Sequence, residues 1–305
     1  MSYQDFEIID FHVHLPVGWG GGGAGPREED LNQRYARQRR ESWRAQWGFP
    51  DPEHNPDADI DYYVERWVEE VEKHGLSRVV LVTGGGNQEL ARVIKDHGDI
   101  FSGFAHHPLA DPDVLPKLRM AVEEQGLAGY KLIGPRQDIA FDDPSLESLW
   151  QYIEDRELPV NIHFGFLGTG GGVVSHPLID PLTIFPVAHS HPGIPFVIPH
   201  FGSGYWRELL QLCWSCPNVH IDTSGSNQWM DWMPYDLTLK DLFRKAYDTV
   251  GPSRIIFGTD SSWFPRGFAH RYLEEQMEVC REIGMSPGDI EMVFSGNARR
   301  LLKLT

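Results

Sequence analysis

Eight short β-rich segments recur along this chain, and helical patterns separate them. Each segment is rich in Val, Ile or Phe and ends in Gly, Pro or a polar residue, as buried strands do. Strands that alternate with helices predict a parallel sheet, because parallel strands need a crossover connection that is usually a helix. The predicted strands are residues 7–14, 78–84, 101–107, 128–134, 159–165, 195–202, 219–224 and 255–263.

Eight such units predict a single α/β domain over residues 1–305, folded as a (β/α)8 or TIM barrel. The clearest helical pattern covers residues 57–75, where apolar residues return at helical spacing and Gly75 supplies a stop. An open, doubly wound sheet is the alternative, but it would normally carry a glycine-rich phosphate loop after the first strand. Histidines stand at that position, so the sequence favours the barrel.

Two insertions are longer than a bare barrel needs, and both follow a strand. The first, residues 17–58, contains Gly20 to Gly23 and then a basic, aromatic stretch, "RYARQRRESWRAQWGF". The second, residues 166–181, is a glycine-rich loop after the fifth strand. Barrel enzymes keep their active sites on the face where strands end. We therefore expect the first insertion to act as a lid, hinged at its glycines.

Composition excludes several classes of partner. The net charge of −17 argues against nucleic acids and anionic membranes. The longest apolar runs have five or six residues, so we expect no membrane span. The start, "MSYQDFEIID", lacks the pattern of a signal peptide, and a cytoplasmic protein is the default expectation. Cys213 and Cys216 form an isolated CxxC, which we assign to helix packing and a helix end.

A pair of histidines closes the first predicted strand, in "EIIDFHVHLP". Side chains alternate across a strand, so His12 and His14 should both point into the barrel near its mouth, with Phe11 and Val13 facing the helices. Buried imidazoles need polar partners, and a metal ion would satisfy both rings at once.

Other strand ends strengthen this hypothesis. His163 ends the fifth strand, His200 the sixth and Asp260 the eighth, and Lys131 lies near the end of the fourth. Each residue alone could be a satisfied core side chain or a helix cap. Together they place metal-competent groups at one height around the mouth, which predicts a metal site.

The motifs "DFHVH", "NIHFG", "PHFG", "FGTDS" and "FSGNARRLL" resemble the amidohydrolase superfamily, whose members are (β/α)8 barrels with a His-x-His signature. They are most similar to its amidohydrolase-related branch, which includes aminocarboxymuconate-semialdehyde decarboxylase. The resemblance runs through nearly the whole chain apart from the first insertion. It is specific for fold and metal site, and it identifies no substrate.

The resemblance implies one divalent ion, most often zinc with manganese as the other candidate, held by His12, His14, His163 and Asp260. It implies that His200 hydrogen-bonds the metal-bound water and polarises the substrate, and that Asp260 also shuttles the proton. In binuclear members a carboxylated lysine, here Lys131, bridges two metals and His200 binds the second. We expect one metal.

Four residues are candidate substrate contacts. Arg266 and Trp263 follow Asp260 closely, and an arginine at the mouth suits a carboxylate, although a surface arginine paired with an acid is the alternative. Lys131 and His107 are the other two. His106, His176 and Arg136 are weaker candidates.

The predicted metal site indicates an enzyme. The first candidate is a hydrolase that cleaves an amide, ester or lactone bond of a small molecule with a metal-activated water. The alternative is a non-oxidative decarboxylase (a carboxy-lyase) or a hydratase, acting on an aromatic or unsaturated acid. Either enzyme would use the same metal site. Two or more cations converging near the metal would favour decarboxylation, and a neutral aromatic pocket would favour hydrolysis. A binding module is the non-enzymatic alternative. Tryptophans in the first insertion suggest a homodimer.

Overall fold

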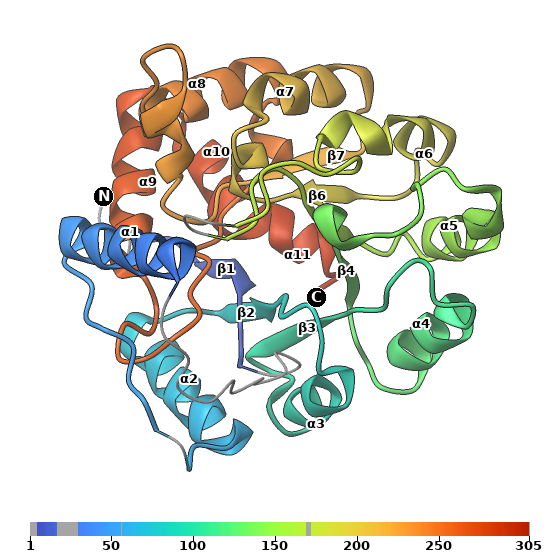
Figure 1. Cartoon of the computed structure of the whole chain (residues 1–305), viewed down its shortest axis with the longest axis horizontal. Helices are drawn as coiled ribbons and strands as arrows, with labels where there is room; N and C mark the ends of the chain where they lie inside the picture. The colour runs from blue at the N-terminus through green and yellow to red at the C-terminus, as the bar shows by residue number, and fades with distance from the viewer. Residues whose placement is uncertain (1–4, 17–29, 56, 169–171, 305) are drawn as a thin grey trace.

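The computed structural model describes residues 5–16, 30–55, 57–168 and 172–304, and it confirms the predicted barrel (Figure 1). Eight parallel strands pair in the order in which they occur in the chain. The residues after the eighth strand then bond to the first: the amide of Asp260 donates to the carbonyl of His12 at 2.8 Å, and the amide of His14 donates to the carbonyl of Ser261 at 2.8 Å. The strands are β1 (Ile9–Val13), β2 (Arg78–Leu81), β3 (Phe101–Ala105), β4 (Gly129–Ile133), β5 (Val160–His163), β6 (Phe196–Ile198), β7 (Val219–Asp222) and β8 (Ile255–Ile256).

Helices surround the strands, as Figure 1 shows. Within the described residues, none of them is both long and apolar enough to cross a membrane. The helices are α1 (Leu31–Trp47), α2 (Ile60–His74), α3 (Asn87–His97), α4 (Val114–Glu123), α5 (Glu147–Asp155), α6 (Phe185–Ser190), α7 (Trp206–Ser215), α8 (Leu239–Val250), α9 (His270–Glu282), α10 (Pro287–Glu291) and α11 (Asn297–Leu301).

The apolar core has two parts, and one of them corrects a prediction about Phe11. Phe11 packs edge-on against Phe104 of β3, with ring centroids 5.6 Å apart, and shares a cluster with Val197 of β6 and Leu301 of α11. Side chains from strands on different sides of a barrel can meet only inside it. Phe11 therefore points inward, because a register shift interrupts the alternation of β1 between Asp10 and Val13.

The first insertion contains a helix that was not predicted from the sequence. Asp30 caps α1 through a capping box with Gln33, and Gly48 ends it with a positive φ of 64°. Trp43 packs on Trp263, with centroids 5.6 Å apart, and Trp47 packs on Tyr272 at 4.6 Å. Trp43 and Trp47 thus contact their own chain, and the homodimer stays a prediction.

Other expectations about the insertions and cysteines have different outcomes. Gly20 to Gly23 lie outside the described residues, so the lid stays a prediction. The loop 166–181 folds back on itself, because Leu167 and Val173 exchange backbone hydrogen bonds.

Burial raises the pKa of the Cys213 thiol to about 12, and Arg254 donates to the carbonyls of Cys213 and Cys216, which agrees with a packing role at the end of α7.

Candidate metal centre

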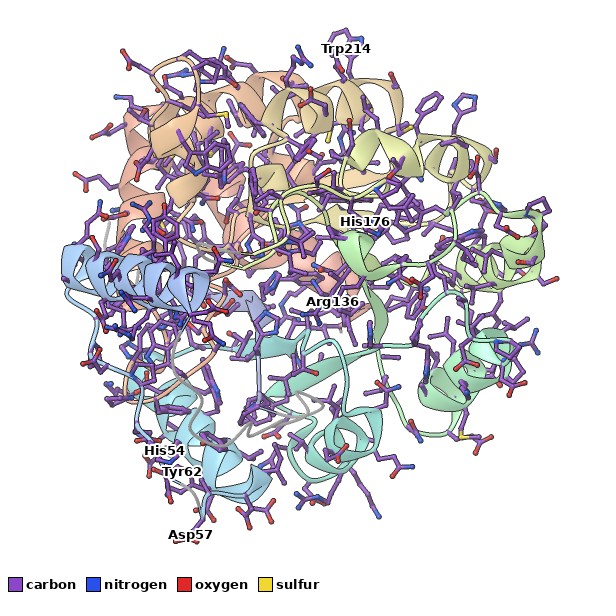
Figure 2. The ribbon with its side chains drawn as sticks, viewed as in Figure 1. His54, Asp57, Tyr62, Arg136, His176 and Trp214 are labelled. Carbon is purple, nitrogen blue, oxygen red and sulfur yellow. The ribbon has the colours of Figure 1, made fainter. Side chains whose placement is uncertain are left out.

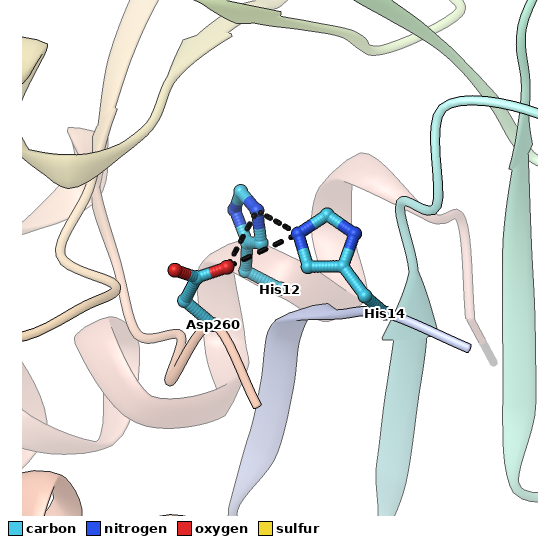
Figure 3. Close-up of side chains that lie close together, drawn as sticks. All are labelled: His12, His14 and Asp260. Atoms are coloured by element: carbon cyan, nitrogen blue, oxygen red, sulfur yellow. Dashed lines mark hydrogen bonds and ion pairs between the residues drawn. The ribbon is translucent and has the colours of Figure 1, made fainter. Parts of the chain in front are cut away.

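Three predicted ligands converge at the mouth of the barrel (Figure 3). His12 lies on β1, His14 follows β1 directly, and Asp260 lies in the segment after β8. The two Nε2 atoms are 3.2 Å apart, and Asp260 Oδ1 lies 3.1 Å from His14 Nε2 and 3.8 Å from His12 Nε2. Tetrahedral zinc with bonds of about 2.1 Å separates its ligand atoms by about 3.4 Å. The donor set and its spacing fit a divalent ion.

Asp222, at the end of β7, fixes the orientation of His12. His12 Nδ1 lies 2.6 Å from Asp222 Oδ2, and both side chains are buried. A carboxylate accepts from Nδ1–H, which leaves the Nε2 lone pair for a metal. Asp222 was not among the predicted site residues, although "VHIDTS" places a polar residue at the end of a strand just as the other motifs do.

Asp260 is held by its backbone as well as by its neighbours. Its φ of 60° is in the left-handed region, which costs a non-glycine residue about 1–3 kcal/mol and is often found at functional sites. Its amide donates to the carbonyl of His12, and its own carbonyl accepts from Arg266 at 2.9 Å. These bonds at both ends fix the direction of the carboxylate.

The carboxylate of Asp260 is ionised. Burial raises its pKa, but the hydrogen bond from His14 and the imidazoles of His200 and His12 outweigh burial and hold the pKa well below its ordinary value. An ionised carboxylate can both ligate a cation and accept a proton.

His163 and His200 face this group from β5 and the segment after β6. The ring of His200 lies 4.8 Å from that of His12 and 5.1 Å from that of His163. His163 Nε2 donates to the carbonyl of Phe166 at 2.8 Å. His163 is not part of the close group of ligand atoms formed by His12, His14 and Asp260. Burial lowers the pKa of His163 to about 3, so the ring is neutral as a ligand must be. Its ligand role stays a prediction.

Lys131 is buried beside the metal group. Its Nζ donates to Asn161 Oδ1 at 2.6 Å, and burial lowers its pKa from 10.5 to about 8. The ammonium form therefore still dominates at pH 7.

Two cavities open on these residues. One, of about 450 Å³, is lined by His12, His14, Lys131, Arg136 and Asp260. Figure 2 shows Arg136 near the centre of the view. The other, of about 470 Å³, brings aromatic residues of later loops, Phe166, Trp229 and Trp232, up to His163, His200 and Asp260. Because His163, His200 and Asp260 border both cavities, the metal group lies between them.

Of the remaining candidate substrate contacts, Arg266 and Trp263 lie near the metal site and His107 lies apart from it. Arg266 is 9% exposed, with its guanidinium carbon 3.5 Å from the Trp263 ring centroid, and within the described residues it forms no ion pair with an acid. Arg266 is therefore buried near Asp260, unlike the surface arginine paired with an acid that was the alternative. By contrast, the His107 ring contacts Asn87 at 3.1 Å and lines neither cavity.

The weaker histidine candidates have local contacts. His106 Nδ1 donates to the carbonyl of Lys131 at 2.8 Å. His176 Nδ1 accepts from the amide of Leu178 at 3.2 Å.

Comparison with known proteins agrees with this architecture. A family model described as Amidohydrolase matches residues 9–304. No curated protein matches the sequence. The solved structures described below are 16–17% identical to this chain, so their likeness shows the fold alone.

Three of these structures are informative. A dihydroxybenzoic acid decarboxylase from Polaromonas sp. JS666, with manganese and 2-nitroresorcinol bound, is 17% identical over 98% of this chain and 97% of that chain, with a TM-score of 0.60. A probable 2-pyrone-4,6-dicarboxylic acid hydrolase from Acinetobacter baumannii, with citric acid bound, is 16% identical over 97% and 99%, with a TM-score of 0.59. An amidohydrolase from Burkholderia multivorans with bound zinc is 17% identical over 98% and 100%, with a TM-score of 0.61.

Proposed function

Because this chain belongs to the amidohydrolase family, we propose that it is a metal-dependent enzyme that decarboxylates a small aromatic or unsaturated carboxylic acid without an oxidant. The observation that carries this proposal is that two cations, Lys131 and Arg136, line the same cavity as His12, His14 and Asp260. Cations in a confined cavity attract and orient an anionic substrate. The names of two similar structures support a carboxylic acid as substrate, since dihydroxybenzoic and 2-pyrone-4,6-dicarboxylic acid are both carboxylic acids. The first of these structures is named a decarboxylase and the second a hydrolase.

His12, His14 and Asp260 would hold the divalent ion, with His163 as the further ligand. Zinc or manganese there would supply a Lewis acid for a substrate oxygen and lower the pKa of water to about 7. Similar structures that contain manganese or zinc support either ion.

Asp260 would transfer the proton that replaces the carboxylate on the substrate carbon. When the bond between the substrate carbon and its carboxylate breaks, carbon dioxide leaves and the electron pair stays on the substrate carbon. Asp260, ionised at rest, first takes a proton from solvent and then delivers it to that carbon. Lys131 lies where its positive charge would stabilise the negative charge that builds on the substrate.

Hydrolysis of an ester, lactone or amide is the second candidate, and the aromatic cavity favours it. Phe166, Trp229 and Trp232 offer a largely apolar wall next to His200 and Asp260. In that reaction Asp260 would accept a proton from the attacking water and return it to the leaving group.

The test is a panel of hydroxybenzoic acids, unsaturated acids and lactones incubated with zinc- or manganese-loaded protein. Decarboxylation releases one carbon dioxide per turnover, and in D2O the product carries deuterium at the carbon that lost its carboxylate. Hydrolysis of a lactone or ester releases one acid equivalent and no carbon dioxide. The control is Asp260→Asn, expected to lower either rate by about 10²–10⁴-fold. Loaded protein that turns over nothing on the panel would refute both candidates.

A further inference from the structure

We propose that a third cavity, between α1 and the loop after β8, is an anion subsite that binds a second carboxylate of the substrate, so that the preferred substrate is a dicarboxylic acid. This inference rests on the proposed function, because it assumes that the reacting end of the substrate lies at the metal group. The cavity has a volume of about 290 Å³, and its lining includes Arg40, Trp43, Trp263 and Arg266.

Three residues that line the cavity carry a buried donor without an acceptor. Trp43 Nε1, Trp263 Nε1 and Arg266 Nε are all buried, and none has a hydrogen-bond partner among the residues that the structure describes. Indole and guanidinium groups donate hydrogen bonds and cannot accept them. Leaving one buried donor unsatisfied costs about 1–3 kcal/mol, so three around a single cavity point to an acceptor that binds there.

Arg266 is fixed in place before any ligand arrives. One Nη2–H donates to the carbonyl of Asp260, and the guanidinium lies over Trp263 and faces Phe49 at 5.3 Å. Burial lowers its pKa to about 10, which still leaves it charged at neutral pH. Charge, rigidity and a free Nε–H suit a carboxylate, which arginine binds through two parallel hydrogen bonds.

The third cavity adjoins the metal group through one residue. Asp260 lines it and also lines both cavities at the metal. The carbonyl of Asp260 contacts Arg266, and its carboxylate belongs to the metal group. Arg266 and the metal group are therefore separated by about the length of one aspartate residue. A small diacid can reach both.

Calorimetric titration of the metal-loaded protein with benzoate and with the diacids isophthalate, terephthalate and glutarate tests the subsite. At least one diacid should bind roughly tenfold or more tightly than benzoate, as expected for added hydrogen bonds to a charged group. Trp43→Phe removes a single N–H and should reduce that advantage about fivefold or more, with benzoate affinity unchanged. Arg266→Lys keeps the charge and should lose part of the advantage.

Trp214→Phe is the matched control, since Trp214 is 79% exposed and lies on α7 at the edge of the molecule (Figure 2). It should behave like the wild type. Equal affinity for benzoate and all three diacids, or an advantage that survives Trp43→Phe, would overturn the subsite. So would binding of acetate at the cavity with no gain for a linked diacid.

Because these are binding measurements, the two proposals can fail separately. Carbon dioxide release without a diacid preference refutes only the subsite. A diacid preference without turnover refutes only the reaction.

Discussion

His12 Nδ1 and Asp222 Oδ2 are 2.6 Å apart in the barrel interior, where neither side chain is more than 1% exposed. The carboxylate sets the imidazole tautomer, and the tautomer decides whether Nε2 carries a lone pair or a proton. We expect Asp222→Asn to weaken zinc affinity by about 10–100-fold, as the loss of such partners usually does. Competition with a chromophoric chelator measures this.

The fold should survive this substitution, because Asn has nearly the same shape as Asp. A circular dichroism spectrum and melting temperature close to those of the wild type would confirm it. Unchanged zinc affinity in a folded Asp222→Asn protein would show that His12 does not depend on Asp222.

We expect Lys131 to lower the free energy of unfolding while it supports activity. Its pKa of about 8 against 10.5 in the unfolded chain corresponds to roughly 3 kcal/mol of unfavourable free energy below pH 8. Lys131→Met removes this cost but leaves Asn161 Oδ1 without its donor, which costs about 1–3 kcal/mol. We therefore expect a net gain of about 1 kcal/mol at pH 7, together with at least a tenfold loss of activity.

The sign of the Lys131 effect can be checked by pH. Between pH 8 and 10.5 the unfolded chain keeps a proton that the folded protein has released, so wild-type stability rises with pH in this window. The advantage of Lys131→Met should shrink there and reverse. Denaturant unfolding at pH 7 and 10 tests this, and a constant difference would contradict it.

His163 remains the predicted fourth ligand. We expect His163→Gln to lower zinc affinity more than tenfold and to change the visible spectrum of the cobalt-substituted protein, because the ion would lose an imidazole. His189→Gln, at an exposed position on α6, is the control. A cobalt spectrum identical to that of the wild type would assign His163 to the substrate instead.

The sequence could predict the barrel and the strand-end residues because both follow from local periodicity. It could not show that Phe11 points inward, since the register shift in β1 depends on pairing with β2. Asp222 could have been predicted from its place at a strand end, in the same way as His163 and Asp260. Helix α1 was hidden because its apolar residues are few and its partners, Trp263 and Tyr272, are more than 200 residues away.

The three cavities could not be predicted in the same way. The donors of the anion subsite come from α1 and from the loop after β8, and only the tertiary fold brings Trp43 to Arg266. The arginine itself was a candidate contact from its place after Asp260. Its burial, which makes the unpaired Nε informative, depends on the packing of Trp263 and Phe49 against its guanidinium.

His220 should make the protein less stable in mild acid. It is 4% exposed, its Nδ1 lies 3.2 Å from the carbonyl of Asn218, and its Nε2 lies 3.4 Å from Arg300. Burial, and then the charge of Arg300, lower its pKa to about 4. From pH 6.5 down to 4 the unfolded chain binds a proton at His220 that the folded protein does not bind. The free energy of unfolding therefore decreases as pH falls through this range.

Between pH 7 and 5 the loss assigned to His220 is about 2 kcal/mol. His220→Gln should therefore lose about 2 kcal/mol less than the wild type over this range in urea unfolding. His54→Gln, at an exposed position (Figure 2), is the matched control and should follow the wild type. Since the other titrating groups are common to all three proteins, equal losses in the wild type and His220→Gln would mean that the buried imidazole accepts its proton without unfolding.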